Sequence, residues 1–183
     1  MSLLPTILYR NNISKHLDEI RAGYIKLSGH GVIHGLMCVD QDAKIVAINE
    51  NFDKNLNIWD LGALGAAMYG VSKQGADFFQ SENLERADMI YGNNQFLVRS
   101  IGGFQLDARG NRELLIVVLA DKKVNIGLMI LQMQKYAKII KDEVEENAKI
   151  KETLKLSEEE MRAHIRDIKN QLFKKAESLK MTV

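Results

Sequence analysis

An uninterrupted apolar run in the second half of the chain places the strongest constraint on the fold. Six apolar residues, rich in β-branched side chains, occupy positions 114–119. Such a run is typical of a β-strand that is buried on both faces. A short polar turn follows, and we expect a helix to begin at Asn125. No glycine-rich loop separates this strand from the helix, so the segment lacks the phosphate-binding loop of nucleotide-binding proteins.

Weaker patterns predict the elements of the first half of the chain. An amphipathic stretch from Ile13 to Tyr24 predicts a helix that is capped by Asn12. Apolar runs at 32–39 and 44–49 flank a polar turn and predict a β-hairpin. A loop that holds Trp59 should then lead to a second helix, capped by Asp60. The apolar stripe of this helix contains Leu61, Leu64, Met68 and Val71.

A second predicted hairpin precedes the apolar strand. The runs 87–91 and 95–101 flank Gly92-Asn93-Asn94, which is a strong turn signal, and a loop at 107–111 leads into the last strand. The predicted order is therefore helix, two strands, helix, three strands, helix. We expect an α/β protein with a five-stranded antiparallel meander. Because its first and last strands are apolar throughout, helices should cover both sides of the sheet.

Two segments resemble the roadblock (dynein light-chain) family. In one, the apolar strand passes through Ala120-Asp121-Lys122 into a helix that starts with Asn125-Ile126-Gly127-Leu128; the other is the strand and turn at 31–40. The resemblance covers about residues 13–138. It implies a roadblock-like α/β/α sandwich with a five-stranded antiparallel sheet. It also implies a small dimeric scaffold or regulator of Ras-like GTPases, without an active site of its own.

Small residues on the second helix suggest close packing. Gly62, Ala66 and Gly70 follow one another at four-residue spacing, and each glycine costs a helix about 1 kcal/mol relative to alanine. This row could pack on the chain's own sheet or on a second copy of the chain. By the family resemblance, the dimer or partner interface contains Gly62, Ala66, Met68, Gly70, Ser72 and Lys73 on the helix, and Arg86, Ala87, Asp88, Met89, Ile90 and Tyr91 on a strand that pairs with the partner.

The C-terminal part departs from the family pattern. We expect a roadblock-like domain at residues 1–140 and a helical extension at 141–183, which has no glycine or proline and a near balance of opposite charges. The core stripe of the last helix should end near Ile140, and Asn147 interrupts the spacing. The extension could be one long helix or two helices hinged near Ser157. Its apolar stripe suits a coiled-coil seam or a partner groove, and contains Ile150, Leu154, Met161, Ile165, Ile168, Leu172 and Leu179.

Composition argues against several functional classes. The net charge of +1 offers no basic excess for nucleic acid or an anionic membrane, and no segment has the roughly 20 apolar residues that span a bilayer. The single Cys38 lies in an apolar run, so we expect a buried thiol, and no disulfide within the chain, as in a cytoplasmic protein. The histidines show no metal-ligand spacing, and no nucleophile motif occurs. We therefore expect no cofactor, no metal and no enzymatic activity.

Two functional hypotheses remain. The first is a non-enzymatic, homodimeric regulator or scaffold for a small Ras-like GTPase, and its partner rests on the family resemblance alone. The second is a structural adaptor whose C-terminal helical tail recruits another protein complex. The two differ in the surface that binds the partner, because a regulator would use the globular core and an adaptor the tail.

Overall fold

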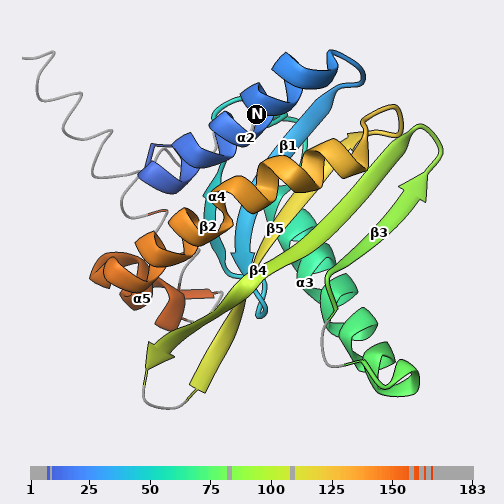
Figure 1. The fold of residues 1–183 in the computed structure, drawn as a ribbon. Helices are drawn as coiled ribbons and strands as arrows, with labels where there is room; N and C mark the ends of the chain where they lie inside the picture. The colour runs from blue at the N-terminus through green and yellow to red at the C-terminus, as the bar shows by residue number, and fades with distance from the viewer. Residues whose placement is uncertain are drawn as a thin grey trace, which may run out of the picture.

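The computed structural model of the protein describes residues 10–81, 84–107 and 110–156, together with Leu8, Glu159, Glu160, Ala163 and Arg166. The predicted order of helices and strands is confirmed, and the described residues add a 3₁₀ helix and a short helix after Asn147 (Figure 1). The elements are α2 (Asn12–Ser28), β1 (Ile33–Asp40), β2 (Ile45–Ile48), α3 (Ile58–Gln74), η1 (Gly75–Phe79), β3 (Arg86–Tyr91), β4 (Asn94–Asp107), β5 (Gly110–Asp121), α4 (Ile126–Glu146) and α5 (Ala148–Lys155).

The five strands form one antiparallel sheet, but not a meander. Their order is β2-β1-β5-β4-β3, so the first and last strands are neighbours at the centre of the sheet. A meander would leave β1 at an edge, where one side of its backbone would lack strand partners. The central position instead gives both apolar strands two neighbours, and the connection through α3 joins the two edge strands. The expectation that β1 and β5 are buried on both faces is confirmed.

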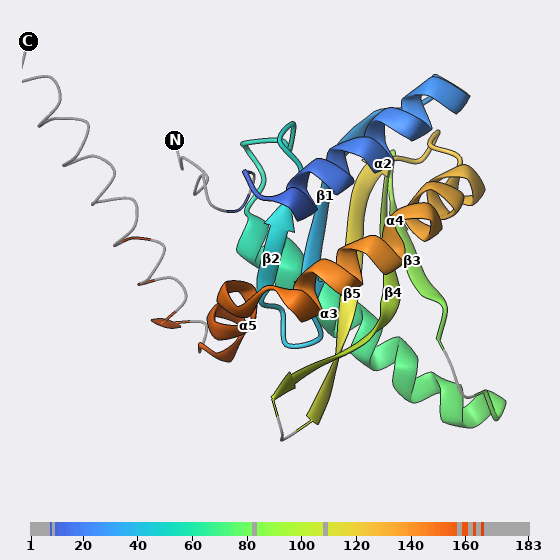
Figure 2. The ribbon, with the colours of Figure 1, turned by 60° about the vertical axis from the view of Figure 1, so that its left-hand side comes forward.

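Helices cover both faces of the sheet, as predicted. Helices α2 and α4 lie side by side on one face, and α3 lies on the other (Figures 1 and 2). Alternate residues of the central strands therefore enter two separate cores. In β5, Ile116 and Val118 belong to the core beneath α2 and α4, whereas Leu115 and Val117 belong to the core beneath α3. This arrangement is the α/β/α sandwich.

Asparagine residues begin the helices, although not always the ones that the sequence predicts. Asn11 rather than Asn12 caps α2, and its side chain accepts a hydrogen bond from the backbone N–H of Ser14. Asn57 rather than Asp60 caps α3, so that Trp59 lies in the helix and not in a loop. The corrections move the helix start by one residue for α2 and by three for α3, because Asn and Asp are both good N-caps and compete when they lie close together.

The chain after α4 turns back onto the domain. Helix α4 ends at Glu146, and Asn147 caps the separate helix α5. Helix α5 in turn ends at Lys155, two residues before the position of the predicted hinge, Ser157, which lies outside the described residues. Val144 and Leu154 are buried in the core beneath α2 and α4, beyond the predicted end of the core stripe at Ile140. Core packing thus extends past the domain boundary that was predicted at residue 140. The predicted tail residues Met161, Ile165, Ile168, Leu172 and Leu179 lie outside the described residues.

The β4–β5 hairpin is longer than predicted. Strand β4 continues past the predicted end of its run at Ile101 to Asp107, and β5 begins at Gly110, inside the predicted loop. Phe104 and Leu106 of this extension are buried in the same core as Leu154 of α5. Gly102 has a φ of +110°, and the strand register shifts beside it. This irregularity explains why the sequence pattern of the strand was hidden at Gly102-Gly103.

Candidate interaction surface

Helix α3 packs unusually close to the sheet because small residues form its inner face. A Cβ atom on Gly65 would lie 2.7 Å from Cγ2 of Val117 in β5, closer than such contacts occur. A Cβ on Gly62 would lie 3.6 Å from Cγ1 of both Val39 and Ile45. The chain's own sheet therefore explains why glycine occupies position 65, whereas a Cβ at position 62 would make only ordinary van der Waals contacts.

This orientation corrects part of the predicted interface. Gly62, Ala66 and Met68 are buried against the chain's own sheet and are not available to a partner. The predicted row of small residues combined two faces of the helix, because Gly62 and Ala66 face the sheet and Gly70 does not. Gly70 lies on the exposed side, and no atom would lie within 4 Å of a Cβ added to it. Nothing in the described part of this chain requires glycine there.

The exposed side of α3 is apolar as well. Leu64 and Val71, which the sequence pattern assigns to the core stripe, are exposed, Val71 by 70%. Phe78 and Phe79 in η1 follow on the same projecting segment and are exposed by 88% and 83%. A helix that is apolar all round is usually covered on all sides. Sequence reasoning missed this surface because periodicity cannot tell which of two apolar faces meets the sheet.

The other predicted residues of the helix lie at its flank. Ser72 is half-buried, and Lys73 is exposed with its Nζ 3.5 Å from Oε1 of Glu113 in β5. This ion pair spans the end of α3 and the sheet. It is too exposed to contribute more than about 1 kcal/mol to stability.

The predicted pairing strand β3 lies at an edge of the sheet. It pairs with β4 on one side, and no described strand pairs with its other side. Ala87 and Met89 pack toward the core beneath α3, whereas Ile90 is exposed by 66%. Arg86 and Asp88 form an exposed ion pair with 3.2 Å between Nε and Oδ2. Tyr91 is also exposed and donates a hydrogen bond to Sδ of Met89.

The opposite edge of the sheet is closed by the chain itself. Strand β2 has only four residues, and all are buried. The Asn11 side chain donates a hydrogen bond to the Val46 carbonyl, and Leu8 packs in the core beneath α3 beside this edge. Natural sheets commonly protect an edge in this way against pairing with other chains. Of the two edges, β3 is the one that the described residues leave open.

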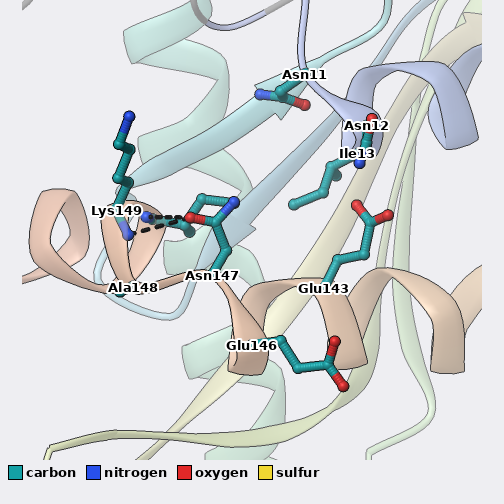
Figure 3. Close-up of a pocket in the computed structure, with 9 residues that line it drawn as sticks. Asn11, Asn12, Ile13, Glu143, Glu146, Asn147, Ala148 and Lys149 are labelled. Atoms are coloured by element: carbon teal, nitrogen blue, oxygen red, sulfur yellow. Dashed lines mark hydrogen bonds between the residues drawn. The ribbon is translucent and has the colours of Figure 1, made fainter.

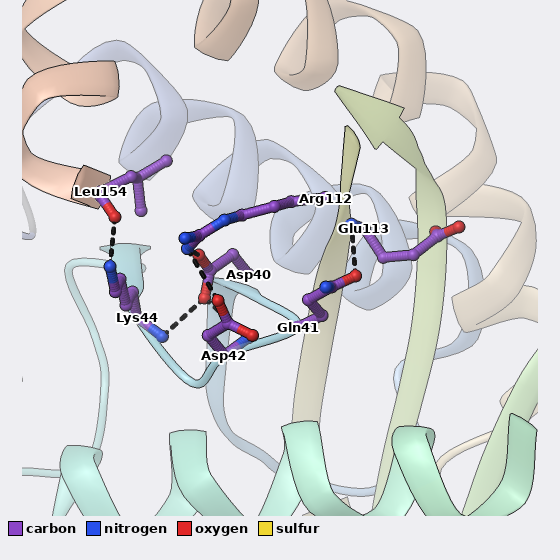
Figure 4. Close-up of polar contacts among 7 residues, drawn as sticks. All are labelled: Asp40, Gln41, Asp42, Lys44, Arg112, Glu113 and Leu154. Carbon is purple, nitrogen blue, oxygen red and sulfur yellow. Dashed lines mark hydrogen bonds and ion pairs between the residues drawn. The ribbon is translucent and has the colours of Figure 1, made fainter. Parts of the chain in front are cut away.

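A polar cluster fastens α5 to the turn between β1 and β2 (Figure 4). The Nζ of Lys44 donates a hydrogen bond to the backbone carbonyl of Leu154, at the C-terminal end of α5. Leu154 itself is only 1% exposed. The prediction that Leu154 belongs to a free tail surface is therefore wrong, and Ile150 is also packed against this core. The carbonyl of a helix end and a lysine are favourable partners.

The same cluster contains a buried carboxylate. Asp40 is completely buried, and its Oδ2 lies 2.8 Å from Nη1 of Arg112. Its Oδ1 accepts hydrogen bonds from the backbone N–H groups of Asp42 and Lys44. The guanidinium of Arg112 also lies 2.8 Å from Oδ2 of Asp42, so it joins both carboxylates of the turn (Figure 4). These contacts satisfy the charges within the chain and indicate a structural role.

The buried carboxyl of Asp40 should make the difference in stability between wild type and an Asp40→Asn variant depend on pH. Burial raises the pKa of its carboxyl above the ordinary 3.8, although hydrogen bonds from Lys44 and Arg112 oppose the shift. As the pH rises above 3.8, the unfolded chain releases this proton first, so the folded state loses stability until the folded pKa is passed. Relative to wild type, we expect the free energy of unfolding of Asp40→Asn to increase with pH across this window.

Urea unfolding at a series of pH values measures this difference. Asp42→Asn removes an exposed carboxylate from the same arginine and serves as the matched control. A difference between Asp40→Asn and wild type that stays constant or falls with pH would contradict the expected shift.

A shallow cavity of about 480 Å³ lies where α2 begins and α4 meets α5 (Figure 3). Glu143 and Glu146 line it together with Lys149, and Ile13 forms an apolar part of its wall. The lining has no cysteine, serine or histidine that could act as a nucleophile or base.

Other site types find no support in the described part of the chain. No group of histidine, cysteine and carboxylate side chains there could hold a metal ion. No described helix is both long and apolar enough to cross a bilayer. Cys38 is buried, as predicted, and burial raises the pKa of its thiol.

The architecture is similar to that of three solved structures. Myxococcus xanthus MglB has 12% identity and a TM-score of 0.56, with 75% of this chain and 98% of that chain covered. The chain has the roadblock fold. The gliding protein MglB from Thermus thermophilus has 13% identity and a TM-score of 0.57, with coverage of 79% and 100%. A Roadblock/LC7 domain from Streptomyces avermitilis has 13% identity and a TM-score of 0.54, with coverage of 70% and 97%.

The likeness concerns structure and not sequence. No protein-family model matches the chain, and no curated protein is a significant match. The match covers 97–100% of the three solved chains but only 70–79% of this chain. The sequence resemblance to this family was carried by strand and turn segments, and the structure confirms the fold that they implied.

Proposed function

We propose that the protein is a non-enzymatic, homodimeric regulator or scaffold for a small Ras-like GTPase in the cytoplasm. The roadblock fold and the family resemblance of the sequence support this function. The observation that carries the dimer is Gly70, an exposed helical glycine with open space around it. Its cost to the helix of about 1 kcal/mol is offset if a second chain packs closely there.

The proposed dimer interface consists of the exposed side of α3 and the open edge of β3. It retains Gly70, Ser72 and Lys73 and the strand from Arg86 to Tyr91, and it excludes the buried Gly62, Ala66 and Met68. A two-fold axis beside β3 would let two copies pair antiparallel and close each other's edge. Both surfaces lie on the same side of the molecule, where α3 approaches β3 (Figure 1).

The adaptor hypothesis remains as the alternative function. Residues 157–183 contain the second part of the predicted apolar stripe, which could recruit another complex. The packing of Ile150 and Leu154 in the core leaves only this second part for that role. The two hypotheses therefore predict different effects of removing residues 157–183.

A binding experiment with two chain lengths decides between them. We expect a protein that ends at residue 156 to capture the same Ras-like GTPase as the full chain, with less than about a tenfold change in Kd. The GTPase should be tested with GDP and with a GTP analogue bound, because a regulator distinguishes the two states. Loss of capture on truncation would favour the adaptor, and failure of both chains to bind any GTPase would contradict the proposed partner.

The regulator should not bind nucleotide by itself. Its strand-to-helix connections contain no glycine-rich phosphate loop, and the turn before α4 is Lys122-Lys123-Val124. Calorimetric titration of the purified protein with GTP or ATP should therefore show no stoichiometric binding. A complex with GTP or ATP of micromolar affinity would contradict this prediction and would support an enzymatic function.

A further inference from the structure

Helices α2 and α4 form the outer layer on the side of the sheet opposite α3 (Figures 1 and 2). A Cβ atom on Gly23 of α2 would touch the side chain of Gln132 in α4, and Nε2 of His16 lies 3.5 Å from Oε1 of Glu143. The two helices therefore run antiparallel. The second half of α2 lies beside the first turns of α4, and the start of α2 lies beside the end of α4.

One half of this layer has positive charge alone. No Asp or Glu occurs at positions 20–39 or 122–141, whereas four occur at 142–146. Among the described residues, no carboxylate forms an ion pair with the exposed lysines of this half. The net charge of +1 for the whole chain hides this separation. We define the basic face by its five exposed lysines, which are Lys26 on α2, Lys122 and Lys123 in the turn before α4, and Lys135 and Lys138 on α4.

Exposed aliphatic side chains lie among these lysines. Leu27 on α2 is exposed by 61%, and Leu131 and Ile139 on α4 are exposed by 58% and 45%. Other residues of both helices fill the core, so these three side chains lie on the solvent side of the layer. Lysines beside exposed aliphatic side chains suit an anionic bilayer, because the ammonium groups attract the lipid headgroups while the aliphatic groups enter the boundary with the acyl chains.

We propose that the basic face docks on the surface of an anionic lipid bilayer. This inference goes beyond the proposed GTPase regulator, and the basic face shares no residue with the proposed dimer interface. Nucleic acid also offers phosphates, but a phosphate backbone has no apolar counterpart for Leu27, Leu131 and Ile139. The docking is peripheral, which agrees with the finding that no described helix could cross a bilayer.

The proposed homodimer would present two basic faces to one membrane. Antiparallel pairing at β3 continues the sheet through a two-fold axis that is perpendicular to it, so the α2 and α4 layers of both copies lie on the same side. Two weak contacts on one particle bind more tightly than either contact alone. Only this use of two faces rests on the proposed homodimer.

Vesicle sedimentation with the full chain tests the proposal. The probe is a phosphatidylcholine vesicle with about 30% phosphatidylserine, and pure phosphatidylcholine is the neutral comparison. We expect wild type to bind the anionic vesicles about tenfold more strongly or better, and added salt to weaken this binding. Lys26→Glu/Lys135→Glu should remove most of the preference. Lys54→Glu/Lys149→Glu makes the same change of charge at exposed positions outside the basic face and should keep most of it.

An apolar variant separates docking from unspecific attraction between charges. Leu27→Ser/Leu131→Ser keeps every lysine but should lower vesicle binding by about tenfold at low and at high salt. Circular dichroism checks that each variant is folded. Equal binding of wild type to neutral and anionic vesicles, or equal losses in the two lysine variants, would overturn the basic face as a membrane site.

The outcomes also separate this inference from the proposed function. A wild-type protein that is monomeric but binds anionic vesicles through Lys26 and Lys135 would overturn the homodimer and leave the basic face in place. A dimer that captures a GTPase but prefers no vesicle would overturn only the membrane proposal, and an acidic protein surface would then be the better occupant of this face.

Discussion

A protein truncated after Lys141 should lose its cooperative unfolding transition, whereas a protein truncated after Leu156 should keep it. The shorter chain loses Val144 and Leu154, both of which are buried in the core beneath α2 and α4. Removing a single large apolar side chain from a core costs about 2–5 kcal/mol, and a whole domain of this kind is stable by about 5–15 kcal/mol. Urea unfolding followed by circular dichroism distinguishes the two chains.

Point variants in the protein that ends at residue 156 separate the contribution of α5 from that of chain length. Leu154→Ala should lower the free energy of unfolding by about 2–5 kcal/mol, and Lys155→Ala, at an exposed position of the same helix, should change it by less than about 0.5 kcal/mol. A cooperative, fully stable protein after truncation at Lys141 would show that α5 is an appendage. It would also support the domain boundary that the sequence predicts at residue 140.

The apolar run of β5 shows what the sequence determines well. Its β-branched residues require burial on both faces, and this requirement alone places helices on both sides of the sheet. The pattern does not determine strand order, because a meander and the observed order bury the same residues of each strand with different neighbours. The pairing of β1 with β5 depends on contacts between distant segments that no local pattern reports.

Helix α3 shows where the pattern is ambiguous. Both of its faces carry small or apolar residues, so the row of Gly62, Ala66 and Gly70 could not be divided between the sheet and a partner. The structure divides it, because Gly65 and Gly62 approach the sheet and Gly70 does not. The interruption at Asn147 was visible in the sequence, but the return of α5 to the core was not.

Gly70→Glu should convert the protein into monomers and leave each monomer at least as stable as before. A Cβ at this position has open space around it, and replacing a helical glycine by a better helix former adds up to about 1 kcal/mol of stability. In the proposed dimer, two carboxylates would instead be forced together beside the two-fold axis. Light scattering measures the mass, and thermal unfolding measures the stability of the same sample.

Ala66→Glu provides the matched contrast four residues earlier on the same helix. Ala66 is buried against the chain's own sheet, so a carboxylate there should destabilise the fold itself by more than about 3 kcal/mol, whatever the state of association. If Gly70 also served only the fold of the single chain, both variants should lower the free energy of unfolding by a similar amount. A Gly70→Glu protein that is stable and still dimeric would instead place the dimer interface elsewhere, and the open edge of β3 would then be the first surface to test. The proposed interface requires the two effects to separate, with folding lost at Ala66 and association lost at Gly70.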